Sequence, residues 1–220
     1  MGLFDRFKKQ DCEICGKEVG MFGYKKLKDG EICKDCVKLL SPWFEDRKES
    51  TVAQIKAQIA YRAQNAEELK SFQPTKTFGD KYYMFVEERD GVPYRFCVSP
   101  SEDYQKENAD LVLFENVEEV IIDIDDHAHE HHNDEEDPDD VTYDLSYSFR
   151  VNFIIKNNPY FDSMHFELNS EDVEVFSVGL KYYGGEDSDE FEYFNGLYPE
   201  FVEKYKKYKT MCDEIEAMCK

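Results

Sequence analysis

The segment that decides the fold of the N-terminal region reads Cys12-Glu-Ile-Cys15-Gly16, and after an intervening stretch Cys33-Lys-Asp-Cys36. Two close pairs of thiolates are the ligand set that Zn²⁺ takes in closed tetrahedral sites, where no position remains for water or substrate. The 17 residues between the two pairs fall within the range typical of such sites. The sequence therefore predicts one structural zinc ion bound by Cys12, Cys15, Cys33 and Cys36.

The residues around the cysteines fit this interpretation. Gly16 follows the first pair, where the chain has to turn tightly, and Asp29-Gly30 precedes the second, where a type I′ turn would close a hairpin. The alternative is a pair of disulfides, which requires an oxidising compartment for which nothing in the sequence argues. We therefore expect residues 1–48 to form a zinc ribbon or knuckle module whose folding depends on the metal.

The charge of the chain is distributed unevenly. The 220 residues carry 27 basic and 49 acidic side chains, a net charge of −22. Residues 1–48 hold 11 basic and 9 acidic side chains, a net charge of +2, whereas the remaining residues hold 16 and 40, a net charge of −24. A body this acidic repels phosphate backbones and anionic lipid surfaces. We therefore expect the body to bind neither nucleic acid nor a membrane surface.

The sequence contains no apolar run long enough to span a membrane, which takes about 20 residues. The first nine residues are too polar and too short for a secretory signal. We therefore expect a cytoplasmic protein.

A helix is predicted from Thr51 to about Ser71. Thr51-Val-Ala-Gln54 has the form of a capping box, which marks a helix start. Apolar residues then recur every three or four positions and predict one buried stripe: Val52, Ile55, Ile59, Ala63, Ala66 and Leu69. We expect residues 49–72 to link the zinc module to the rest of the chain. Trp43, the only tryptophan, is interpreted as a packing residue between the two parts, with ligand stacking as the alternative.

Residues 73–195 have the pattern of an antiparallel β-domain. Residues 82–88 and 93–98 flank the turn Arg89-Asp90-Gly91, and residues 111–114 and 117–124 are two further β-rich runs. The clearest strand spans residues 143–155, where Tyr143 begins six apolar residues that alternate with polar ones. Seven or so strands without intervening helices favour an antiparallel sandwich or open barrel in an α+β protein.

The last segment, residues 196–220, is predicted to be a helix that closes one end of this β-domain. Pro199 fits the first turn of such a helix. The apolar positions are spaced at intervals of four and three residues: Phe201, Tyr205, Tyr208, Cys212, Ile215 and Cys219. Cys97, Cys212 and Cys219 are expected to be small buried residues outside any metal site.

Residues 123–140 contain ten carboxylates, four histidines and no basic residue. A segment of this composition buries too little apolar surface to fold, so we expect a mobile surface loop. Its histidines are a candidate second site for Zn²⁺, Ni²⁺ or Cu²⁺, weaker than the cysteine site: His127, His129, His131 and His132. The alternative is a solvated loop that binds metal only adventitiously.

Residues 10–70 resemble DUF4428, a zinc-finger-type domain family of bacterial proteins whose function is unknown. The likeness rests on Cys12-Glu-Ile-Cys-Gly16, on Lys26-Leu-Lys-Asp-Gly-Glu-Ile-Cys-Lys-Asp-Cys36 and on the helix that begins near Thr51. It implies zinc at the four cysteines and a bacterial source, and it brings no activity. The order of the remaining elements is similar to bacterial pleckstrin-homology-like domains, although the acidic segment departs from a basic lipid-binding pocket.

Three functions follow from these patterns. Because no catalytic motif or phosphate-binding loop is present, we expect a non-catalytic adaptor that binds another protein. The first alternative is a regulator that binds nucleic acid through the zinc module, where Tyr24 lies among several lysines. The second is metal sensing or storage by the histidine-rich segment.

Overall fold

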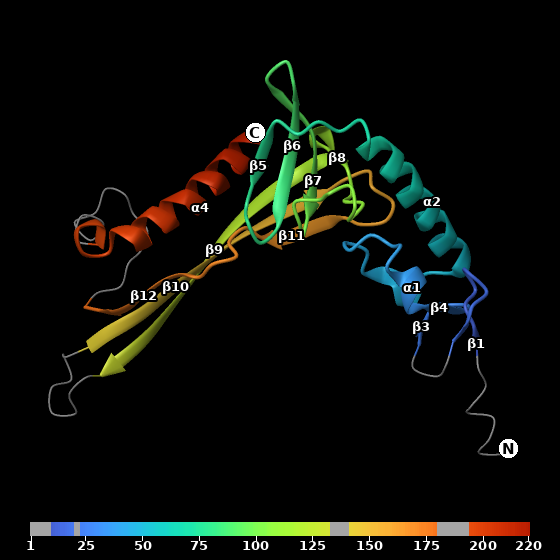
Figure 1. The fold of residues 1–220 in the computed structure, drawn as a ribbon, viewed down its shortest axis with the longest axis horizontal. Helices are drawn as coiled ribbons and strands as arrows, with labels where there is room; N and C mark the ends of the chain where they lie inside the picture. The colour runs from blue at the N-terminus through green and yellow to red at the C-terminus, as the bar shows by residue number, and fades with distance from the viewer. Residues whose placement is uncertain (1–9, 20–22, 133–140, 180–193) are drawn as a thin grey trace.

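The computed structural model describes residues 10–19, 23–132, 141–179 and 194–220, and it shows the predicted mixture of helices and antiparallel strands. In Figure 1 the N-terminal module lies at one end of the molecule, and the end of the strand Val117–His132 lies at the other. Two sheets and two long helices lie between them. Neither these helices nor any other helix in the described ranges could span a membrane.

The N-terminal module consists of two short hairpins and a short helix. The first hairpin pairs β1 (Gln10–Asp11) with β2 (Glu18–Val19), and the second pairs β3 (Tyr24–Lys26) with β4 (Glu31–Cys33). Helix α1 (Lys34–Val37) follows β4 directly, and a 3₁₀ turn, η2 (Asp46–Glu49), leads to the next helix.

Helix α2 spans Val52–Leu69 and begins as the sequence predicts. The Thr51 side chain accepts a hydrogen bond from the Gln54 backbone N–H, and the Gln54 side chain accepts one from the Thr51 N–H, which completes the capping box. The buried face differs from the predicted apolar stripe, because Ala63 is exposed. Three polar residues replace the apolar ones in the middle of the face, whose members are Ile55, Gln58, Arg62, Asn65 and Leu69.

The first sheet is an antiparallel meander in the order β5 (Lys76–Phe78), β6 (Tyr83–Arg89), β7 (Val92–Ser99) and β8 (Val112–Leu113). Asp90 and Gly91 form the two-residue loop between β6 and β7, and both have positive φ (52° and 78°). This is the geometry of a type I′ turn, so the predicted hairpin is confirmed.

The second sheet is organised around β10 (Val141–Ile155). One edge of β10 pairs with β9 (Val117–His132) over its whole length. The other edge pairs with β11 (Ser163–Glu167) and, nearer its start, with β12 (Val173–Val178). A 3₁₀ turn, η3 (Phe114–Asn116), joins the two sheets, and neither sheet closes into a barrel.

The two sheets share the main hydrophobic core. Met84, Val86 and Phe96 from the first sheet lie in one buried cluster with Phe149 and Phe153 of β10. The opposite face of the first sheet contributes Phe85 and Cys97 to a smaller cluster that includes Leu69 at the end of α2. The first sheet is therefore buried on both faces.

Helix α4 (Pro199–Met218) packs against β9, β10 and β12. Pro199 lies in its first turn, as predicted. Its buried face matches the predicted spacing through Phe201, Tyr205, Tyr208, Cys212 and Ile215, whereas Cys219 is only partly buried at the C-terminal cap.

The prediction of a mobile loop from Asp123 onward is wrong for the part of it that is described. Strand β9 continues through Asp123 to His132, and each of these residues has a partner on β10. The backbone hydrogen bonds of β10 extend the strand although the segment has almost no apolar side chains, a contribution that composition does not reveal. Residues 133–140 lie outside the described residues, as do residues 1–9.

Candidate metal centre

The first pair of cysteines lies on the turn between β1 and β2. The Cys12 N–H donates to the Lys17 carbonyl (3.0 Å), and the Gly16 N–H donates to the Cys12 carbonyl (2.8 Å). Gly16 has φ of +69°, in the left-handed region where a residue with a Cβ is strained. The chain turns here as the sequence predicts, and both Cys12 and Cys15 reach the same side of the turn.

The second pair lies at the end of β4 and in α1. Cys33 is the N-cap of α1, and its sulfur accepts a hydrogen bond from the Cys36 N–H (3.4 Å). The hairpin before it is confirmed, but the predicted type I′ turn is wrong, because neither Asp29 nor Gly30 has positive φ. Close packing explains why position 30 is a glycine, because a Cβ on Gly30 would lie 2.7 Å from Val52 Cγ2.

The four sulfur atoms lie within 4.8 Å of one another, and the Cys15 and Cys33 sulfurs are 3.8 Å apart. Sulfurs bound to one tetrahedral Zn²⁺ at about 2.3 Å would lie roughly 3.8 Å from each other. A disulfide requires about 2.05 Å, and all seven cysteines are free thiols in this structure. The spacing fits a four-coordinate metal and not a pair of disulfides.

The four thiols differ in burial and in the direction in which their surroundings shift the thiol pKa. Cys12, Cys33 and Cys36 are buried, and Cys15 is exposed. Burial works to raise the pKa of Cys12, but backbone hydrogen bonds from Cys15, Cys33 and Ile14 outweigh it and lower that pKa to about 6. Burial and the neighbouring sulfurs raise the pKa of Cys36. A bound dication would favour the thiolate form of all four cysteines, so binding releases protons.

The module and the start of α2 form one packed unit. Ile32 and Ile55 are fully buried beside the cysteines, with Leu27 and Leu40 completing the cluster. The Asp29 carboxylate accepts a hydrogen bond from the Val52 N–H (2.7 Å) at the first turn of α2. The cysteine cluster is therefore fixed to the helix that leads to the β-body.

A buried polar network, which the sequence analysis missed, joins this unit to the body. Arg62 Nη1 lies 2.7 Å from Asp110 Oδ1, and both side chains are almost fully buried. The Ser41 hydroxyl donates to the other Asp110 oxygen (2.8 Å), and the Asn65 side chain donates to the Ala109 carbonyl (2.8 Å). Burial raises the pKa of Asp110, while Arg62 and Ser41 oppose the shift. No local signal in the sequence connects Arg62 with Asp110.

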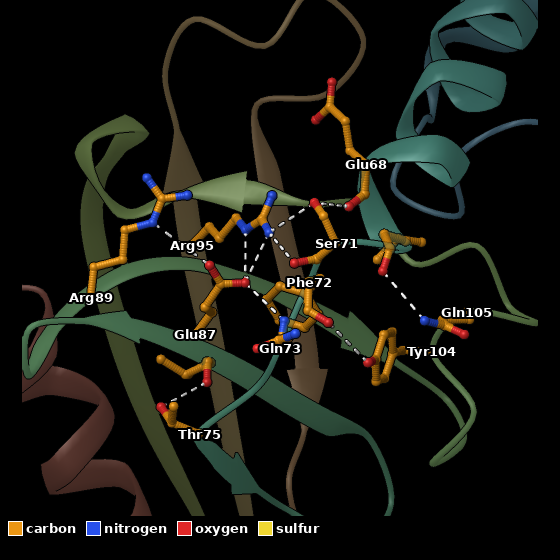
Figure 2. Close-up of polar contacts among 12 residues, drawn as sticks. Glu68, Ser71, Phe72, Gln73, Thr75, Glu87, Arg89, Arg95, Tyr104 and Gln105 are labelled. Carbon is orange, nitrogen blue, oxygen red and sulfur yellow. Dashed lines mark hydrogen bonds and ion pairs between the residues drawn. The ribbon is translucent and has the colours of Figure 1, made fainter.

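A second polar cluster fixes the C-terminal end of α2 to the first sheet. Figure 2 shows the Glu87 carboxylate, which accepts hydrogen bonds from Arg95 Nη2 (2.9 Å) and from the Gln73 N–H (2.9 Å). The same Arg95 nitrogen donates to the Ser71 carbonyl (3.0 Å). Because these charges satisfy one another, we interpret the cluster as structural.

Trp43 lies where the prediction places it, against the main core and next to the module. Its ring is 6.4 Å from the ring of His165, an exposed residue of β11, in an edge-to-face arrangement. Both side chains line a hollow of about 690 Å³ between the module and the body, together with Arg62.

The structure separates the four candidate histidines. His127, His129 and His131 lie at alternate positions of β9 and so share one face, whereas His132 lies on the other face. His132 Nε2 is 3.2 Å from Glu130, and His131 Nε2 is 2.7 Å from Asp144 of β10. The predicted set of four ligands does not converge on one point.

The comparisons with known proteins agree with the cysteine site. Residues 10–58 match the sequence model of a family described as a domain of unknown function, DUF4428. This segment contains all four cysteines and the start of α2, so the predicted resemblance is confirmed there. No curated protein and no solved structure matches the chain. The likeness of the body to pleckstrin-homology-like domains stays a prediction.

Proposed function

We propose that the four cysteines bind one Zn²⁺ with a structural role, in a non-catalytic protein whose body binds another protein. The observation that carries the metal assignment is the group of four sulfurs within 4.8 Å, three of them from buried residues. Four thiolates complete the coordination of zinc and leave no open position for substrate. The zinc therefore stabilises the N-terminal unit and takes no part in a reaction.

The binding role is supported by the charge of the body. Residues outside the first 48 carry a net charge of −24. Such a surface attracts basic partners and repels acidic ones, and it accelerates the encounter more than it strengthens the final complex. The partner class that this charge favours is a basic protein of the same compartment. We propose the cytoplasm as that compartment, because free thiols are maintained there.

The zinc assignment is tested by native mass spectrometry of untagged protein after dialysis against a weak chelator. We expect one zinc per chain in the wild type and none in Cys12→Ser or Cys33→Ser. Cys97→Ser is the matched control, because Cys97 is a buried cysteine of the body that belongs to a different hydrophobic cluster from the buried candidate ligands. Retention of zinc by both cluster variants would overturn the assignment.

The binding role is tested by cross-linking in the native cells and identification of the linked proteins. We expect basic proteins, with a yield that falls as salt is raised from about 50 to 500 mM, because salt screens the attraction. A partner set without excess positive charge, or a yield that does not change with salt, would contradict the role assigned to the acidic body.

A further inference from the structure

The hairpin formed by β9 and β10 presents a row of histidines that the structure aligns on one face. His127, His129 and His131 alternate with residues that point to the other side of the strand. The rings of His129 and His131 are 4.6 Å apart between centroids and perpendicular to each other. All three side chains are at least partly exposed, so the face is accessible to a dissolved ion.

The neighbouring strand adds a carboxylate to this row. Asp144 is the direct partner of His129 in the ladder, so their side chains lie on the same face. The Asp144 Oδ2 atom is 2.7 Å from His131 Nε2. The register of the hairpin therefore places two imidazoles and one carboxylate on one face, although the ligand atoms of the three residues do not all lie within 4.8 Å of one another as the cysteine sulfurs do.

The orientation of this carboxylate is fixed by a bulge in β12. Tyr143 and Leu145 pair with Val178 and Val175, so β12 has one residue more than β10 at this point. Within the bulge Ser177 has φ of +55°, and its N–H donates to Asp144 Oδ1 (2.9 Å). One carboxylate oxygen is thus held by the backbone, and the other is directed towards His131. Partners of this kind orient metal ligands in known sites.

We propose that His129, His131 and Asp144 form a second site, for a divalent transition metal that prefers imidazole, such as Ni²⁺, Zn²⁺ or Cu²⁺. Two imidazoles and a carboxylate are a common ligand set for such ions. Ligand atoms on a tetrahedral ion are roughly 3.3 Å apart, so His131 and Asp144 have to separate by roughly 0.6 Å from their present contact. The exposed His129 side chain has to move towards them, because the three ligand atoms do not all lie within 4.8 Å of one another in this structure. A water molecule completes the coordination, and this open position distinguishes the site from the cysteine cluster.

The charges around the three ligands favour a cation. Asp125 lies on the same face of β9 as His129, and its Oδ2 is 3.3 Å from His127 Nε2, whereas Asp126 and Glu130 lie on the opposite face. Among the described lysines and arginines, only Arg150 forms an ion pair with this part of β9, and its Nη1 lies 3.0 Å from Asp125 and 4.0 Å from Asp123. Arg150 is paired with Asp123 in the ladder, well away from Asp144 along β10. The proposed ligands are therefore not neutralised by it.

The test is calorimetric titration of untagged full-length protein, already loaded with one zinc, with Ni²⁺ alone. We expect one further ion per chain, with affinity reduced about tenfold or more in His129→Ala, in His131→Ala and in Asp144→Asn. Asparagine at position 144 keeps an oxygen that accepts the Ser177 N–H, so the bulge is preserved while the charged ligand is lost.

His132→Ala is the matched control, because His132 is an exposed histidine of the same strand on the opposite face. We expect this variant to bind Ni²⁺ as the wild type does. Equal losses in all the histidine variants would show adventitious binding by composition and would overturn the proposal. So would an unchanged affinity in Asp144→Asn, or no binding by the wild type. Because the first zinc is counted separately, a failure here leaves the cysteine assignment intact.

Discussion

The N-terminal module and the β-body are stabilised by different means. Among the described residues, the buried cluster of the module consists of three cysteines and four other residues, Leu27, Ile32, Leu40 and Ile55. The main core of the body combines large side chains from both sheets and α4, with Phe96, Phe149 and Phe153 fully buried. A small core supplies little free energy of folding, so on our proposal the bound zinc supplies the remainder, whereas the body is stabilised by apolar burial. The two regions should therefore respond independently to loss of metal and to loss of core volume.

The largest expected effect is loss of the module in Cys36→Ser. Without one ligand the zinc dissociates, and the module unfolds while the body remains folded. Hydrogen exchange followed by mass spectrometry should show loss of protection in residues 10–40 and at the start of α2, where Ile55 packs on the cysteines. Cys219→Ser, at the partly buried end of α4, is the control. Unchanged protection in the module would mean that its fold does not need the metal.

The opposite perturbation is Phe153→Ala in the body. Phe153 is fully buried, and its ring lies 4.8 Å from Phe96. Truncation of a buried phenylalanine costs about 3 to 5 kcal/mol of the free energy of unfolding. Urea denaturation should show this loss, while native mass spectrometry still counts one zinc. Loss of zinc in this variant would show that the two regions are not independent.

Independence should fail where the two regions meet, at the Arg62 and Asp110 pair. Arg62→Met leaves the Asp110 carboxylate buried without its partner, which costs about 3 kcal/mol. The variant Arg62→Met with Asp110→Asn removes both charges and should recover part of that loss. Equal stability of the single and double variants in urea would show that the pair does not couple helix and body.

A smaller effect is expected at Asp80, where α4 is attached to the body. Partial burial works to raise the pKa of Asp80, but hydrogen bonds from Tyr208 (2.6 Å), Lys207 and Ser170 outweigh it and lower the pKa to about 2. Because the folded pKa is below the unfolded value of about 4, this contribution is complete above pH 4 and is lost as the pH falls towards 2.

Tyr208→Phe removes the shortest of these hydrogen bonds and should cost about 1 to 2 kcal/mol at pH 7. The cost should shrink between pH 4 and pH 2, as Asp80 becomes protonated in both forms. Urea denaturation of both proteins at pH 4 and at pH 2 measures this change in cost. Lys209→Gln, which breaks only an exposed ion pair with Asp213, should change stability by less than about 0.5 kcal/mol at either pH. A cost for Tyr208→Phe that is independent of pH would contradict the pKa shift.

Local patterns predicted the elements whose causes are local. The capping box at Thr51, the turn at Asp90-Gly91, the alternation in residues 143–155 and Pro199 in the first turn of α4 each act within a few residues. The four cysteines belong with them, because metal coordination imposes its own spacing on the sequence.

The features that the sequence patterns did not predict depend on contacts between residues that are far apart in the chain. The buried polar face of α2 exists because Arg62 meets Asp110, 48 positions along the chain, and no periodicity in α2 indicates this. The strand from Asp123 to His132 exists because β10 pairs with it. The same pairing separates His132 from the other histidines and places Asp144 among them, so the site proposed on the hairpin follows from register and not from composition.

The most direct test of the central claim is X-ray absorption at the zinc edge of untagged protein that carries one zinc per chain. We predict a first shell of four sulfur atoms at about 2.3 Å, with no nitrogen or oxygen. A shell containing nitrogen or oxygen ligands at about 2.0 to 2.1 Å would contradict it, because it would place the zinc outside the four-cysteine cluster or leave that cluster open.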